Sequence, residues 1–191
     1  MSSQSFMDFL QVLDRLEDKE HLFYKIKYYA APTVASIKPS SLIAFTNLKR
    51  NSYALWERHK KEVCSRLGVN YYELKRNENR VFVLFYERKA LAACLSLQKN
   101  RKFLQDLGYQ KARNLEGYLS LLKNRYQQGC PHELGVFLGY PLEDVLAFIS
   151  NKGGPCLASK YWKVYQDKEK ALQIFKAYDA ERAKVMAELL G

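Results

Sequence analysis

The chain has 191 residues and a formal net charge of +11, and 48% of its residues are hydrophobic and 14% aromatic. This aromatic content excludes a largely disordered chain, and the length predicts a single domain over residues 1–191. No stretch reaches the roughly 18 consecutive apolar residues of a membrane span, and the N-terminus lacks the basic segment of a secretion signal. The sequence therefore predicts a cytoplasmic protein with no membrane partner, whose 4 cysteines are free thiols.

The first third of the chain alternates helical and extended patterns. Apolar residues at helical spacing over residues 5–16 predict an amphipathic helix. Residues 22–29 are rich in Tyr, Phe and Ile, which predicts a short strand or an extended arm. Two prolines in residues 30–41 predict a loop, after which residues 42–46 are expected to form a buried strand.

The strongest β signal lies in the middle of the chain. Residues 71–75 and 81–86 flank a polar Asn-Glu-Asn turn, which predicts a hairpin. The second of these segments is almost continuously apolar, so we expect a central strand covered on both faces. A helix over residues 52–67 precedes the hairpin, with Ser52 as its N-cap and Gly68 at its end.

The second half of the chain is mainly helical. A turn at residues 151–154 precedes a last strand at 161–165, and Asp167 caps a long closing helix. The predicted fold class is α+β: a single domain in which a small mixed or mostly antiparallel sheet, including the 71–86 hairpin, packs with several helices. The short or helical elements expected between the hairpin and the last strand cover residues 90–97, 102–107, 115–126, 131–138 and 141–150.

The densest group of reactive side chains lies just before the middle of this second half. Cys130, His132 and Glu133 supply a thiol, an imidazole and a carboxylate, the groups of a nucleophile, an acid/base and an orienting residue. Asp144 is a second candidate for the orienting role, and Cys156 is a second thiol. The alternative interpretation is structural, because an acid at a helix start is favoured by the helix dipole. No second His follows four residues after the first, so the pattern predicts no zinc site.

The same segment has the spacing of a helix-turn-helix. Gly135 permits a close helix approach, Gly139 makes the turn, and Val145 packs the second helix. The second helix opens with Glu143 and Asp144, whereas phosphates and base edges require basic or amide side chains. We therefore predict a tight helical corner that does not read DNA.

Two further segments carry candidate binding residues. Lys38 lies between two prolines and shortly precedes Ser40, so a positive charge and a hydroxyl are available for an anionic group; the alternative is an ordinary exposed loop. On the last strand, Lys163 and Tyr165 share one face and form an aromatic and basic surface suited to stacking. The alternative is that this strand is packing structure, with Trp162 in the core.

Positive charge is concentrated in one part of the chain. Residues 49–113 carry nearly all of the excess of Lys and Arg over Asp and Glu. Such an excess attracts polyanions through counterion release, which makes nucleic acid a possible partner. The alternative is a solvated surface, because these bases are scattered over several elements.

The string PHELGVFLGYPLEDVLAFI at residues 131–149, followed by YWKVY and a closing helix, resembles a bacterial family known as a domain of unknown function, number 3793 in that series. The blocks APTVASIKPSSLIAF and VFVLFYERKAL are similar to its N-terminal part. The resemblance spans residues 23–178 and implies a cytosolic bacterial protein without an assigned activity. One departure is that Ser159 and Lys160 precede Tyr161, where the family reads glycine. The positions that match the family pattern are Lys38, Pro39, Arg88, His132, Glu133, Gly135, Gly139, Tyr140, Pro141, Glu143, Asp144, Trp162, Lys163 and Tyr165.

Three functional hypotheses follow, in order of preference. The first is a non-enzymatic protein that binds a small anionic ligand or a protein partner in a cleft near Lys38, His132 and Trp162. The second is an enzyme in which His132 acts with Glu133 and a cysteine thiol. The third is nucleic-acid binding through residues 49–113. The sequence identifies no cofactor. The candidate ligand-binding residues are Lys38, Ser40, His132, Glu133, Tyr140, Lys163 and Tyr165.

Overall fold

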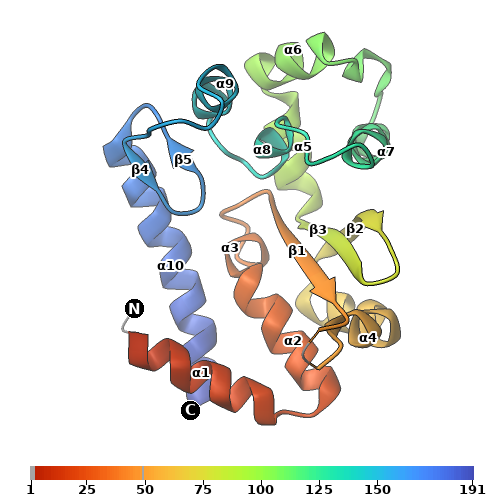
Figure 1. Cartoon of the computed structure of the whole chain (residues 1–191), viewed down its shortest axis with the longest axis vertical. Helices are drawn as coiled ribbons and strands as arrows, with labels where there is room; N and C mark the ends of the chain where they lie inside the picture. The colour runs from red at the N-terminus through yellow and green to blue at the C-terminus, as the bar shows by residue number, and fades with distance from the viewer. Residues whose placement is uncertain (1–2, 49) are drawn as a thin grey trace.

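The computed structural model describes residues 3–48 and 50–191. Helices surround a small antiparallel sheet, and a two-stranded hairpin lies beside the last helix (Figure 1), which confirms the predicted α+β class. The elements in chain order are α1 (Ser3–Arg15), α2 (Asp18–Tyr29), α3 (Ala31–Val34), β1 (Ser40–Thr46), α4 (Ser52–Leu67), β2 (Asn70–Arg76), β3 (Arg80–Tyr86), α5 (Arg88–Ser96), α6 (Gln98–Asp106), the 3-10 turn Tyr109–Lys111, α7 (Leu115–Tyr126), α8 (Leu134–Phe137), α9 (Leu142–Ser150), β4 (Ala158–Ser159), β5 (Lys163–Val164) and α10 (Lys168–Leu190).

The main sheet has the order β1-β3-β2, and both pairings are antiparallel. The predicted hairpin is confirmed, and its second strand is the central one, as expected. Side chains of a strand alternate between its faces. Val81, Val83 and Phe85 accordingly pack against α2 and α4, whereas Leu84 and Tyr86 pack against α5, α7 and α8. The sheet is therefore covered on both faces.

The prediction of a strand or extended arm at residues 22–29 was wrong. This segment belongs to α2, which lies between α4 and α10 and buries Leu22, Phe23, Ile26 and Tyr28. Because the helix has neighbours on several sides, its apolar residues do not follow a single stripe. Its aromatic and β-branched composition reflects this burial and not a β conformation.

Two local predictions nearby also need correction. The predicted loop at 30–41 contains the short helix α3, and Lys38 within it is buried with only 7% of its surface exposed. The N-cap of α4 is Asn51, whose side chain accepts a hydrogen bond from the Ala54 N–H. Ser52 instead joins α4 to β1, because its hydroxyl donates to the Thr46 carbonyl.

The C-terminal part closes the fold. Gly68 ends α4 and Asp167 caps α10, both as predicted. The predicted strand at 161–165 is shorter than expected: only Lys163–Val164 pairs, with Ala158–Ser159 as its partner. Helix α10 packs along α1, α2 and α3, so the two ends of the chain lie together (Figure 1). No helix in the described part of the chain is long and apolar enough to cross a membrane.

Candidate functional site

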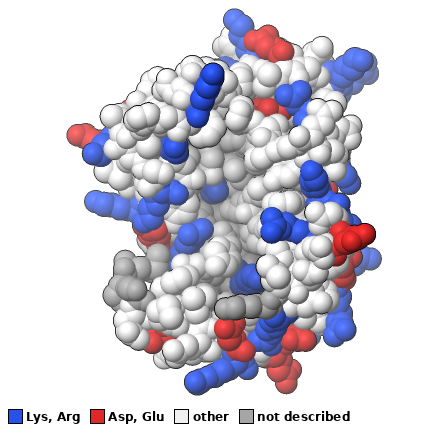
Figure 2. Space-filling model, in the orientation of Figure 1, with Lys and Arg blue, Asp and Glu red and all other residues white. Residues whose placement is uncertain are grey.

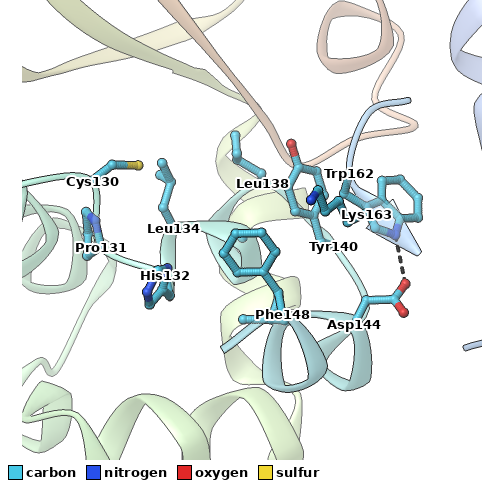
Figure 3. A pocket seen from close by; sticks show the side chains of 12 residues that line it. Cys130, Pro131, His132, Leu134, Leu138, Tyr140, Asp144, Phe148, Trp162 and Lys163 are labelled. Carbon is cyan, nitrogen blue, oxygen red and sulfur yellow. Dashed lines mark hydrogen bonds between the residues drawn. The ribbon is translucent and has the colours of Figure 1, made fainter. Parts of the chain in front are cut away.

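A pocket of about 390 Å³ opens between α8, α9 and β5. Figure 3 shows side chains from these three elements, and from the segment before α8, around one space. Apolar side chains make most of its wall, and His132, Tyr140 and Lys163 add polar atoms. The lining residues are Cys130, Pro131, His132, Leu134, Gly135, Leu138, Tyr140, Asp144, Val145, Phe148, Trp162 and Lys163.

Two glycines bring α8 and α9 close enough to share this pocket. A Cβ on Gly135 would lie 2.8 Å from Cγ2 of Val145, so only glycine permits the approach of the two helices. Gly139 has a φ of +75° and lies against the ring of Pro39. A left-handed φ favours glycine because a Cβ is strained there. The predicted tight corner is confirmed.

Asp144 has a structural task at the base of the pocket. One of its carboxylate oxygens accepts a hydrogen bond from the Trp162 indole N–H at 2.8 Å. The other accepts from the backbone N–H groups of Tyr165 at 2.8 Å and Gln166 at 3.0 Å. With only 3% of its surface exposed, this carboxylate fixes the β5 segment on α9 and does not orient His132.

Glu133 is likewise committed to other partners. It is 2% exposed, forms an ion pair with Arg125 and accepts a hydrogen bond from the Tyr109 hydroxyl at 3.2 Å. Burial and the neighbouring carboxylate raise the pKa of Tyr109 above its ordinary value, so the phenol stays protonated and donates. Glu133 does not line the pocket and does not contact His132 through a hydrogen bond.

The thiol and the imidazole do not form a catalytic pair. In Figure 3 the Cys130 sulfur and the His132 ring lie apart on either side of Pro131. Partial desolvation by the neighbouring residues raises the pKa of the Cys130 thiol, which disfavours the nucleophilic thiolate. The His132 ring instead contacts the edge of Phe148, with 5.5 Å between the ring centroids. Cys156 does not line the pocket.

The remaining polar groups of the pocket come from Tyr140 and Lys163. The Lys163 ammonium donates one hydrogen bond to the Gly153 carbonyl, which leaves two of its N–H groups for another acceptor. The Tyr140 ring stacks on Trp162 with 5.2 Å between centroids, and burial raises its pKa to about 12. Tyr165 lies outside the pocket and donates to the Gly154 carbonyl.

The segment that contains Lys38 and Ser40 contacts α8 and the Tyr140 ring from outside the pocket. The Ser40 hydroxyl donates to the Phe137 carbonyl at 2.7 Å and is fully buried, so it holds β1 against α8. The Lys38 ammonium lies 5.7 Å from the centroid of the Tyr140 ring. The three predicted segments therefore meet in space, but Lys38 and Ser40 do not line the pocket that contains His132 and Trp162.

Sequence reasoning missed several residues of this region. Phe148, Leu134 and Leu138 form pocket walls, and Tyr178 and Arg182 of α10 lie near Lys38. The wall residues look like ordinary core positions in the sequence. The two α10 residues lie far from Lys38 along the chain, and no local pattern signals their approach.

The basic stretch does not form one continuous free surface. Within the described residues of 49–113, several bases pair with carboxylates, and the others are spread over α4, the β2–β3 hairpin, α5, α6 and the segment before α7. The paired bases are Arg50, Lys60, Arg66, Arg76, Arg88 and Lys99.

The fold and the site define an α+β protein with a ligand-sized, mainly apolar pocket; in the described residues, no group of three or more His, Cys, Asp or Glu side chains is placed to hold a metal ion. A family profile matches residues 26–191, and the chain belongs to this family, described as a protein of unknown function (DUF3793). The resemblance seen in the sequence is thus confirmed. No curated protein and no solved structure matches the chain.

Proposed function

We propose that this chain is a non-enzymatic binding protein whose pocket takes a small ligand with an apolar body and one anionic group. The observation that carries the proposal is the composition of the pocket: apolar walls from Leu134, Val145 and Phe148 surround a space into which Lys163 brings a positive charge. Ligand sites commonly combine such walls with a few convergent polar groups.

The charge balance of the pocket supports an anionic group. Asp144 is the acidic residue in the lining, and its oxygens already accept three N–H groups. Within the described residues, Lys163 forms no ion pair with a carboxylate. Its ammonium retains N–H groups that can donate to a ligand. An anion near this ammonium would gain a charge-assisted hydrogen bond in partly desolvated surroundings.

The size of the pocket also fits a small molecule. Its volume of about 390 Å³ lies within the range of roughly 300–1,000 Å³ that is typical of ligand sites. The exposed thiol and imidazole at its edge are not paired for nucleophilic chemistry, which supports binding over catalysis. The free state of all described cysteines supports a reducing compartment, and we propose that the protein acts in the cytoplasm.

A pair of fluorescent probes tests the proposal. Anilinonaphthalene sulfonate has an aromatic body and a negative charge, and N-phenyl-1-naphthylamine has the same body without the charge. We expect both to bind, and Lys163→Met to weaken the sulfonate about tenfold while leaving the neutral probe unchanged. The exposed Lys152 provides the matched control, because Lys152→Met removes the same charge outside the pocket.

A second variant pair locates the apolar body of the probes. Phe148→Ala removes a pocket wall, whereas Leu146→Ala removes an exposed side chain of the same helix that does not line the pocket. We expect only the first to weaken both probes. Equal effects of both variants would show that the probes bind elsewhere. Equal loss of the charged and the neutral probe in Lys163→Met would show that Lys163 does not act through its charge. Either result would overturn the proposal.

A further inference from the structure

A second cationic group, separate from the pocket, lies between α10, the α3–β1 segment and the β4–β5 hairpin. Lys38 is almost fully buried. Its ammonium lies over the Tyr178 ring and the Arg182 guanidinium lies over the Tyr161 ring, and these two rings are in contact, with 5.0 Å between their centroids. Within residues 3–48 and 50–191, no carboxylate forms an ion pair with either side chain. Buried charges are expensive unless they are paired, so two uncompensated cations at one place require an explanation.

Aromatic rings form the walls around these two cations. The Lys38 ammonium lies 5.7 Å from the Tyr140 centroid and 5.8 Å from the Tyr178 centroid. The Arg182 guanidinium lies 4.8 Å from the Tyr161 centroid and 5.4 Å from the Tyr28 centroid. Ring faces attract cations, but they do not neutralise them.

The acid one turn earlier on α10 does not supply the missing charge. Asp179 lies one turn before Arg182 on α10, and its carboxylate accepts from the Tyr161 hydroxyl at 2.9 Å and pairs with Lys160. The Arg182 Nε is buried and has no hydrogen-bond partner. A buried guanidinium N–H without an acceptor is a cost that an anion would remove.

The surface around these elements is open and positive. Figure 2 shows a hollow along the middle of this face, with Lys and Arg side chains in and around it, while Asp and Glu lie toward the margins. An anion approaching this face would therefore meet positive charge.

We propose that Lys38 and Arg182 bind a phosphate group. Two cations match the double negative charge of phosphate better than the single charge of a carboxylate, and the Arg fork suits phosphate oxygens. The Tyr28 and Tyr178 hydroxyls make no hydrogen bond with other described residues and supply further donors at the edge of the cluster. The proposal does not depend on the pocket, because Lys38 and Arg182 do not line it.

Calorimetric titration with inorganic phosphate and with phenyl phosphate tests this site at constant ionic strength. We expect binding of at least one of them, and a loss of at least tenfold in affinity in Lys38→Met and in Arg182→Met. Lys176→Met is the matched control, because this lysine is exposed on the same helix and should leave the affinity unchanged. Tight binding of phenyl phosphate alone would identify a phosphate ester, and of inorganic phosphate alone a free phosphate, as the natural occupant.

Three results would overturn the proposal. They are no binding of either phosphate by the wild-type protein, a wild-type affinity in Lys38→Met or in Arg182→Met, or acetate binding as tightly as phosphate. Circular dichroism of each variant shows whether it is folded, and Arg182→Lys gives a second test at the Arg position. This variant keeps the charge, so we expect it to retain part of the affinity that Arg182→Met loses.

The probes of the Lys163 pocket should be unaffected by Lys38→Met. Failure of the phosphate proposal and failure of the pocket proposal are therefore distinguishable.

Discussion

Three buried charged residues near the pocket differ in the partners that surround their charges. Asp144 accepts three N–H groups, and Glu133 has an arginine and a phenol as partners. Lys38 has neither a carboxylate nor a carbonyl as a partner within the described residues, and its ammonium lies over the rings of Tyr140 and Tyr178. The charges of the two acids are therefore compensated in the native structure, whereas the lysine weakens it as long as no anion is bound.

The cost of burying Lys38 predicts a dependence on pH. Burial, together with the charge of Arg182, lowers the pKa of Lys38 from 10.5 to about 8. Between these two values the unfolded chain binds the proton and the native state does not, so this residue makes the protein more stable as the pH rises. We expect Lys38→Met to unfold with about 2–3 kcal/mol more free energy than wild type near pH 7, and this advantage to shrink as the pH approaches 10.

Urea unfolding in phosphate-free buffers from pH 7 to pH 10 measures this difference. The other groups that face Lys38, namely Tyr140, Tyr178 and Arg182, are present in both proteins, so their own titration largely cancels. Lys176→Met, which removes an exposed lysine, should run parallel to wild type at every pH. A constant gap between wild type and Lys38→Met would contradict the prediction.

At the scale of elements, the corner between α8 and α9 joins the Lys38 segment to the pocket. Pro39 packs on Gly139, and Ser40 donates to the Phe137 carbonyl, so β1 and α8 hold one another in place. Both contacts lie directly after Lys38 in sequence. We therefore expect a change in this corner to disturb residues next to the pocket wall and next to Lys38.

A comparison of two glycines measures the packing at this corner. Gly139 and Gly68 both have a left-handed φ, +75° and +65°, but a Cβ on Gly139 would lie 2.5 Å from Cδ of Pro39, whereas a Cβ on Gly68 would meet no atom within 4 Å. We expect Gly68→Ala to cost about 1–2 kcal/mol from backbone strain. Gly139→Ala should cost roughly 2 kcal/mol more from the clash.

Urea unfolding of both variants, each alone and with Pro39→Ala, separates the two contributions. Removing the proline ring should restore part of the loss in Gly139→Ala, since the two residues are in contact. The same change should be additive with Gly68→Ala. Equal costs for the two glycine variants would refute the close contact with Pro39.

The sequence predicts an element well when the residues that determine it lie close to one another in the chain. Gly68 and Asp167 determine the ends of their own helices, and Gly135 and Gly139 shape the short corner between α8 and α9. The helix ends and the corner that they predict are confirmed. Helix α2 was mistaken for a strand because burial on several sides hides its periodicity. The candidate site shows the same limit: the segment around His132 was found, but the partners that occupy Glu133 and Asp144 come from distant elements.

At the scale of the whole molecule, the net charge of +11 is divided among separate regions. Several bases of the stretch pair with acids of α2, α4, β2, α7 and α9. The remaining bases lie on different sides of several elements. Binding of a nucleic acid requires that many cations follow one phosphate backbone, so this arrangement favours weak and diffuse attraction.

Salt dependence tests this view. We expect a labelled 20-base-pair duplex to bind weakly at about 50 mM salt and to be released by about 200 mM, with the same loss for a single strand. Fluorescence anisotropy across this range measures both. A complex that persists at the higher salt would instead support the nucleic-acid hypothesis, and Arg101 and Lys102 on α6 would then be the first residues to substitute.

The packing of α10 against the first three helices also sets the order in which the protein can mature. A ribosome releases the chain from its N-terminus, so Lys38 leaves long before Arg182 and Tyr178 have been added. Its surroundings cannot form during that interval, because the helix that encloses it is still inside the ribosome or not yet made. Contacts between distant parts of a chain form slowly. The nascent chain therefore holds Lys38 without these partners until α10 has left the ribosome, and the cationic cluster forms only after that point.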